Sequence, residues 1–360
     1  MKRRNLIKGG LAAATAGTLA APAVLTAATK KRFRWRLVMV IPKTLPIWGT
    51  GVVGFAKKVA LMTDGRLKIK VYGAGELVPA LGTFDAVKAG KVQMASSAAY
   101  YWQGKIPASV FFTAVPFGMN AQGMGAWIRN GGGQELWDEL YAPHGVFGLA
   151  GGNTGMQMGG WFNKKINKIS DFKGLKMRIP GLGGKVIERA GGKPMLVAGG
   201  EIYTNLSTGV IDATEWVGPY HDYIMGFYKA ARYYYYPGWH EPGPVLELMI
   251  NKKAFEELPK EFQQVVRSCA AELDRNMLVE WLAKDSEYYE KIKRETKVEI
   301  LPFPPAVMAD LKKFADEVKA GVAESGPLAR KIYDSFTGFQ ARFEAQQAIT
   351  ERAYMKSEHA

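Results

Sequence analysis

Two stretches of this 360-residue chain decide the fold and the candidate site: DFKGLKMRIPG at 171–181 and GVIDATEWVGPY at 209–220. The first predicts a strand, because apolar and basic side chains alternate along it. One face holds Leu175, Met177 and Ile179, and the other holds Lys176, Arg178 and Pro180. Arg178 stands at the strand end, before a Pro-Gly turn, where its planar guanidinium can meet a carboxylate. The alternative is an ordinary surface arginine.

The chain on both sides of these stretches alternates short β-rich runs with helical patterns, the rhythm of an α/β protein. The predicted strands are 35–41, 67–72, 92–96, 146–149, 156–162, 175–179, 194–197 and 213–216, and the predicted helices are 49–63, 81–89, 126–140, 184–190 and 202–208. Tyrosines 233–236 would alternate faces in a strand, and we expect them to pack in the core and hinge.

The C-terminal third is helical in character. Residues 259–295 predict one long helix with an apolar stripe that includes Cys269. A strand is expected at 298–301, an amphipathic stretch after Pro304, and a final helix at 328–355. Phe336, Phe339, Phe343 and Tyr354 on that last helix have no later chain to cover them. This pattern predicts a homodimer.

Composition excludes several classes of protein. The hydrophobic fraction of 48% and charged fraction of 22% are those of a folded globular chain, and one cysteine with four histidines excludes a thiolate zinc site. The net charge of +15 favours an anionic ligand. Nucleic acid is not expected as a partner, because the basic residues are spread among acidic ones and no binding motif occurs.

The N-terminus predicts a secretory signal at residues 1–28, with basic residues at 2–4 followed by a weakly apolar run. The paired arginines resemble a twin-arginine signal. We therefore expect a periplasmic protein without a later membrane span.

Enzyme motifs do not occur: there is no nucleophile elbow, phosphate-binding loop or zinc helix. His240 and Glu241 form an adjacent pair suited to acid–base work, but such a pair without a nucleophile is usually a packing or surface feature. We therefore expect no catalytic residues and no enzyme.

The phrase at 171–178, followed by Gly209 to Ala213, resembles the DctP-type solute-binding proteins of TRAP (tripartite ATP-independent periplasmic) transporters across nearly the whole mature chain. QMGGWF at 157–162, RIPG at 178–181 and EWVGPY at 215–220 are similar to the subgroup that binds 2-oxo acids or lactate with a metal ion. Where relatives without a metal carry asparagine, this chain has Trp216.

The resemblance implies a site for each component. Arg178 is the expected carboxylate clamp, with Asn153, Tyr100, Tyr101 and Tyr220 as further substrate-binding candidates. The expected ligands of a sodium or calcium ion are Gln157, Glu215, the carbonyl oxygen of Trp216, and Glu241. Hard oxygen donors of this kind suit those ions. Removing Arg178 is expected to abolish acid binding and to leave the fold intact.

The implied fold is α/β, a two-lobed periplasmic binding protein with crossing hinge strands and long C-terminal helices. Lobe I would take 34–151 and about 242–280, lobe II 152–241 and about 281–326, and 327–360 would form a C-terminal helix. The implied function is capture of a small 2-oxo or 2-hydroxy monocarboxylate and its delivery to the TRAP permease subunits. The alternatives are another organic acid or a polyol and, more distantly, a secreted enzyme using His240 and Glu241.

Overall fold

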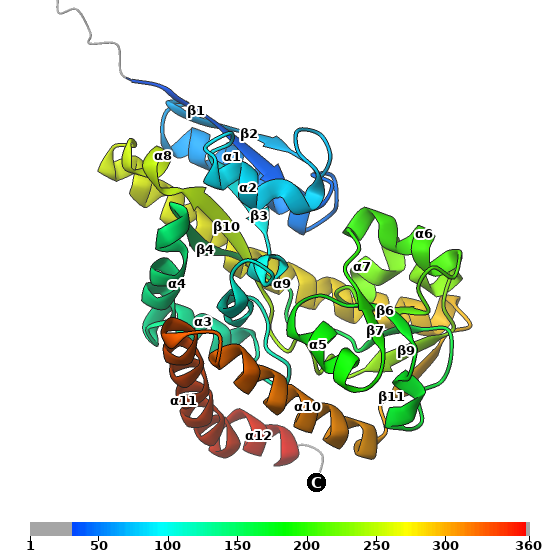
Figure 1. Cartoon of the computed structure of the whole chain (residues 1–360). Helices are drawn as coiled ribbons and strands as arrows, with labels where there is room; N and C mark the ends of the chain where they lie inside the picture. Colours follow the sequence, from blue (N-terminus) through cyan, green and yellow to red (C-terminus); the bar gives the residue numbers. More distant parts are fainter. Residues whose placement is uncertain (1–30, 358–360) are drawn as a thin grey trace, which may run out of the picture. The chain divides into compact units, whose positions relative to one another are not determined.

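The computed structural model describes residues 31–357, so the predicted signal at 1–28 lies outside the described residues. Two β-sheets organise this part of the chain (Figure 1). The first has the strand order β2-β1-β3-β10-β4, and the second has the order β11-β9-β5-β8-β6-β7. The α/β class predicted from the alternating pattern is confirmed.

The first sheet forms from three parallel strands, β1 (Phe33–Met39), β2 (Leu67–Tyr72) and β3 (Met94–Ser97). β10 (Val245–Asn251) is inserted antiparallel between β3 and β4 (Val146–Asn153). The accompanying helices are α1 (Trp48–Met62), α2 (Thr83–Lys88), α3 (Ala121–Asn130), α4 (Gly133–Tyr141) and α8 (Lys252–Glu256). Thus β10, which comes much later in the chain, completes a sheet whose other strands lie before residue 154.

The second sheet uses short strands. They are β5 (Gly160–Phe162), β6 (Lys176–Arg178), β7 (Lys193–Met195), β8 (Ala213–Thr214), β9 (Tyr233–Tyr236) and β11 (Glu299–Pro302), with helices α5 (Gly181–Arg189), α6 (Ile202–Ser207) and α7 (Pro219–Ile224). Both Tyr234 and Tyr235 of β9 are buried, the first stacked on Trp161 and the second on Phe303. The predicted core packing is confirmed for these two tyrosines, which point to opposite faces of the strand, whereas Tyr236 is 42% exposed.

The predicted long helix is confirmed as α9 (Lys260–Glu295), whose buried stripe includes Phe262, Cys269, Met277 and Trp281. α9 contacts β4 and α1 of the first sheet's layer and α7 beside the second sheet (Figure 1). α10 (Pro305–Ala323) follows and packs against α5 and α11. Within residues 31–357 no helix has the length and apolar character needed to cross a membrane.

The final helix departs from the prediction. It divides into α11 (Pro327–Ile349) and α12 (Glu351–Ser357), and α11 folds back onto its own chain. Phe336 is fully buried against Trp127, and Phe339 and Phe343 pack on the same core. The premise that the aromatic residues of this helix have no chain to cover them is therefore wrong for the three phenylalanines.

Residues 126–140 also form two helices rather than the single one predicted. Gly132 adopts φ 86°, a left-handed conformation that ends one helix and begins the next. A Cβ on Gly131 would lie 2.7 Å from the Phe339 ring, so α11 requires glycine at this break.

Candidate functional site

A buried ion pair lies at the carboxyl ends of two neighbouring strands. β6 and β8 are parallel with Arg178 opposite Thr214, so Arg178 ends one strand where Glu215 leaves the other. The Arg178 guanidinium donates from Nη1 to Oε1 of Glu215 and, at 3.3 Å, to the Glu215 carbonyl oxygen. Both side chains are 1% exposed. The two sequence stretches that carried the prediction therefore meet in one cluster.

Trp216 completes the surroundings of Arg178. The guanidinium carbon lies 5.2 Å from the centre of the Trp216 ring, a cation–π contact. Gly199 makes room for that ring, since a Cβ there would come within 2.4 Å of it. Burial by itself lowers the pKa of Arg178, but Glu215 and the nearby Tyr101 and Tyr100 hydroxyls hold it above its ordinary value. Arg178 is thus permanently charged.

Gln157 and Glu241 reach the same cluster from two connecting segments of the chain. The Gln157 amide nitrogen donates to Thr154 Oγ1 at 3.2 Å and to Glu241 Oε2 at 2.9 Å. Because both amide hydrogens are used, the orientation of the amide is fixed. Its oxygen is buried, and none of the described residues donates to it. A fixed, unpaired oxygen of this kind is suited to a cation.

Glu215, His240 and Glu241 bring ligand atoms within 4.8 Å of one another. The second oxygen of Glu215 lies 3.4 Å from Nε2 of His240. Burial, and then repulsion by Glu215, raises the pKa of Glu241 well above its ordinary value. Protonation of Glu241 is therefore easier than for an exposed carboxyl, while Arg178 neutralises Glu215.

Tyr100 and Tyr101 come from the short helical turn Ala99–Trp102 that follows β3, and their rings lie 4.8 Å apart. The Tyr100 side chain is close enough to Glu241 to lower the pKa of that carboxyl, against the larger effect of burial. A Cβ on Gly181, at the start of α5, would lie 3.1 Å from the Tyr100 ring. Segments attached to both sheets thus enclose the cluster.

Asn153 and Tyr220 have other contacts. Asn153 accepts from the Gly155 amide at 2.8 Å and donates to the Gly243 carbonyl oxygen at 3.4 Å, which ties together the segments that leave β4 and enter β10. The Tyr220 ring packs against Tyr288 of α9. The contacts of these two side chains do not place them beside Arg178.

Three neighbours were missed or misread in the sequence. His240 was considered only for acid–base work, yet it lies against Glu215. Sequence reasoning gave no role to Thr154, whose hydroxyl oxygen accepts from the Gln157 amide and fixes it. Sequence reasoning also gave no role to Asp222, a buried side chain of α7.

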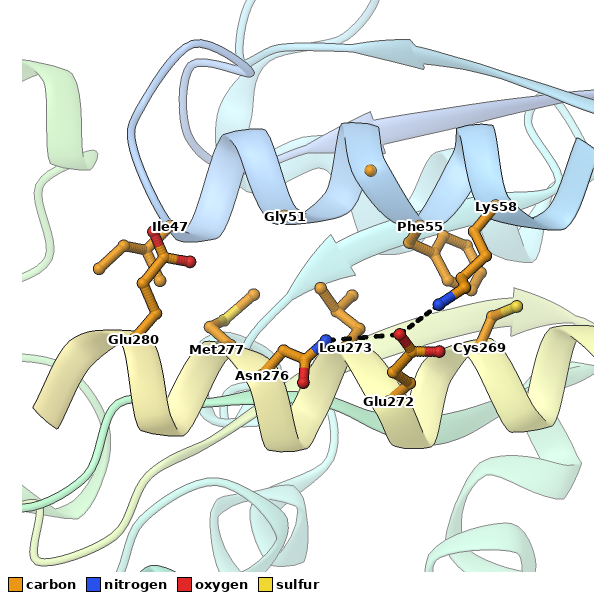
Figure 2. A pocket seen from close by; sticks show the side chains of 11 residues that line it. Ile47, Gly51, Phe55, Lys58, Cys269, Glu272, Leu273, Asn276, Met277 and Glu280 are labelled. Carbon is orange, nitrogen blue, oxygen red and sulfur yellow. Dashed lines mark hydrogen bonds and ion pairs between the residues drawn. The ribbon is translucent and has the colours of Figure 1, made fainter. Parts of the chain in front are cut away.

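A separate groove of about 300 Å³ lies between α1 and α9 (Figure 2). An ion pair between Lys58 and Glu272 spans it, and Asn276 donates to the same carboxylate. Since the Lys58 ammonium is already paired, this groove is less suited to an organic anion than the cluster around Arg178.

Known proteins of one kind resemble this chain. The family model "Bacterial extracellular solute-binding protein, family 7", DctP, matches residues 39–325. A protein of Nostoc sp. named monocarboxylate 2-oxoacid-binding periplasmic protein is 40% identical over 98% of both chains.

Solved structures agree in fold. A TRAP periplasmic solute-binding protein from Pseudoalteromonas atlantica, with bound sodium and pyruvate, is 41% identical with a TM-score of 0.88, covering 91% of this chain and 99% of that one. One from Colwellia psychrerythraea, with bound calcium and pyruvate, is 40% identical at the same TM-score, covering 91% and 100%. This chain therefore belongs to the DctP family, the solute-binding proteins of TRAP transporters, which serve transport and are not enzymes.

Proposed function

We propose that this protein captures a small 2-oxo or 2-hydroxy monocarboxylate, such as pyruvate or lactate, together with a sodium or calcium ion. It does so in the periplasm and delivers the acid to the membrane permease subunits of a TRAP transporter. The observation that carries the proposal is the buried Arg178–Glu215 pair beside the unpaired oxygen of Gln157. The names of the related pyruvate-binding structures support the choice of acid.

The proposed cation ligands are Oε1 of Gln157, the carboxylate of Glu215 and the carbonyl oxygen of Trp216. Their fit rests on donor chemistry: an amide oxygen, a carboxylate and a main-chain carbonyl are ligands that sodium and calcium prefer. The Gln157 amide is already turned so that its oxygen is open. The acid would complete the coordination with its carboxylate and its 2-oxo or hydroxyl oxygen.

Arg178 is the proposed clamp for the acid. A guanidinium presents two parallel N–H donors to a carboxylate, and the low exposure of Arg178 strengthens such bonds. In the described structure one nitrogen of the guanidinium is bonded to Glu215. Binding would thus exchange partners, with the acid taking Arg178 and the cation taking Glu215.

Two lobes closing over the acid are part of the proposal. One is built on the first sheet, with residues 34–151 and about 242–280, and the other on the second sheet, with 152–241 and about 281–326. Contacts of the cluster with Tyr100 from the first and Gly181 from the second support it. Closure would be favoured by the contacts that the acid makes only in the closed form.

We also propose a homodimer, which fewer observations support. Ile349, Tyr354 and Met355 at the end of the chain are 78%, 64% and 59% exposed. A structure from Bordetella bronchiseptica, 34% identical with a TM-score of 0.89, is described as a dimer. Light scattering at micromolar concentration tests it, and a monomer there would contradict it.

The experiment for the main proposal uses dialysed protein with pyruvate, lactate, 2-oxobutyrate or succinate, each with and without sodium or calcium. Thermal unfolding should shift upward with a monocarboxylate plus a cation, since a ligand at 100 times its Kd stabilises by about 2.7 kcal/mol. Arg178→Met should lose the shift, and the exposed Arg189→Met should retain it.

Three outcomes would contradict parts of the proposal. If no monocarboxylate raises the unfolding temperature with either cation, the proposed class of acid is wrong. If the unfolding temperature rises equally without a cation, the proposed metal ion is wrong. Conversion of the bound pyruvate to another compound, seen by NMR, would favour the enzyme alternative.

A further inference from the structure

A buried carboxylate accepts a hydrogen bond from the amide of the peptide between Trp216 and Val217. Oδ1 of Asp222 accepts from the Val217 amide at 3.2 Å. Its other oxygen accepts from the Trp161 indole at 2.9 Å and from the Tyr234 hydroxyl at 2.7 Å. Asp222 is 1% exposed, so the protein supplies these three donors in place of water.

We infer that Asp222 is a positioning residue, which fixes the direction of the Trp216 carbonyl oxygen toward the cation. The inference rests on the proposed function. In a planar trans peptide the N–H of Val217 and the C=O of Trp216 point in opposite directions. Anchoring the N–H on Asp222 therefore turns the carbonyl oxygen away from α7 and fixes its orientation.

The neighbouring carbonyls differ from that of Trp216. The Glu215 carbonyl accepts from Arg178 and from the Thr214 hydroxyl, and the Val217 carbonyl accepts from the Met158 amide. No hydrogen bond among residues 31–357 ends on the Trp216 carbonyl oxygen. In this segment, the Trp216 carbonyl oxygen is therefore the acceptor left open, and its peptide is fixed through the Val217 amide.

The segment that carries Asp222 is itself anchored. Asp285 of α9 accepts from the Tyr220 amide at 2.9 Å, and Nε2 of His221 donates to the Pro46 carbonyl oxygen at 2.9 Å. A Cβ on Gly218 would lie 2.7 Å from the Asp285 carboxylate, so α7 approaches α9 closely. Asp222 consequently acts from a fixed support, as groups that orient metal ligands do.

The first sheet holds a matched comparison. Glu247 is a fully buried carboxyl that also accepts from an indole, Trp102 at 2.7 Å, and from a tyrosine hydroxyl, Tyr141 at 3.0 Å. It has no bond to the segment at 215–217. Comparing Asp222 with Glu247 therefore separates the effect on the peptide from the cost of changing a buried carboxyl.

The experiment measures pyruvate binding by calorimetry across sodium concentrations for the full chain, Asp222→Asn and Glu247→Gln. An amide has one acceptor oxygen for donors on two sides, so Asp222→Asn weakens the hold on Val217. The sodium concentration for half-maximal binding should rise about 10-fold or more, within the 10–100-fold range typical of groups that orient metal ligands. At saturating sodium, pyruvate affinity should return to that of the unchanged protein. Glu247→Gln should leave the sodium dependence unchanged.

Equal sodium dependence of a folded Asp222→Asn and Glu247→Gln would overturn the inference while leaving the proposed function in place. If Asp222→Asn does not fold, Tyr234→Phe and its counterpart Tyr141→Phe test the same point, because each removes one hydroxyl that holds the respective carboxyl. Equal sodium dependence of these two would also overturn it. If the unchanged protein binds none of pyruvate, lactate and 2-oxobutyrate in a cation-dependent way, with sodium or with calcium, the proposed function itself is removed.

Discussion

Replacing Arg178 by methionine should destabilise the free protein, contrary to the expectation from sequence that the fold is unaffected. Glu215 is 1% exposed, and Arg178 is its ion-pair partner. Removing one member of a buried pair typically costs about 3–5 kcal/mol, because the remaining charge is left without compensation. With an unfolding entropy of about 2.1 cal/mol/K for each of about 330 residues, the melting temperature should fall by about 4–7 °C.

A double variant separates charge from packing. Arg178→Met with Glu215→Gln leaves no buried charge at this position and should recover most of the lost stability. The assay is thermal unfolding followed by circular dichroism, without acid ligand, and Arg189→Met serves as the exposed control. The reasoning fails if Arg178→Met unfolds within 1 °C of the unchanged protein, or if the double variant is no more stable than the single one; that bound of about 1 °C is under a quarter of the expected shift.

Other buried groups give further predictions. Burial raises the pKa of Glu247 to about 7, so its contribution to stability is present below pH 4.5 and is lost as pH rises through 7. Glu247→Gln should reduce, by about 3 kcal/mol, the stability difference between pH 4.5 and 8 in urea unfolding, and an unchanged difference would contradict this. Burial lowers the pKa of His221 to about 4, so its contribution is present above pH 6.5 and is lost as pH falls through 4. His221→Phe should therefore lessen acid destabilisation between pH 6.5 and 4, and an equally steep acid limb would count against it. Gly148→Ala places a Cβ 2.4 Å from the Trp137 ring and should cost about 1–3 kcal/mol, whereas Gly54→Ala in α1 meets nothing within 4 Å and should stabilise by about 0.5–1 kcal/mol; equal unfolding midpoints for the two would refute the packing argument.

The elements that sequence predicted well are those with a strong periodic pattern. α9 presents its buried stripe at helical spacing between Phe262 and Ile292, and β6 alternates apolar and basic residues. The position of Arg178 at a strand end followed from that alternation. Its ionic partner did not, because the pairing of β6 with β8 depends on strand order in the second sheet.

Contacts between segments far apart in the chain could not be predicted from local sequence patterns. The Gln157 amide donates to the Glu241 side chain, and the Gln157 main chain is bonded to Gly238 and to Glu241. A Cβ on Gly238 would lie 2.2 Å from the Gln157 carbonyl oxygen, so the close approach of these segments requires glycine. Likewise, the phenylalanines of α11 pack against glycines of α3 and of the turn after it. The periodicity of α11 gives no indication of these contacts.

The charges of the cluster explain why, in the proposed function, acid and cation would bind together. Arg178 and Glu215 cancel each other in the free protein. An acid that takes Arg178 alone leaves Glu215 uncompensated beside a second negative group, and at about 4 Å two unit charges interact by about 4 kcal/mol at a dielectric constant of 20. A sodium ion bound by Glu215 removes this repulsion and returns the total charge to zero. A calcium ion would add one more positive charge beside Glu241, the carboxyl whose pKa is raised by burial and by Glu215. Under the proposed function, charge balance therefore favours sodium, while the same oxygen ligands also suit calcium.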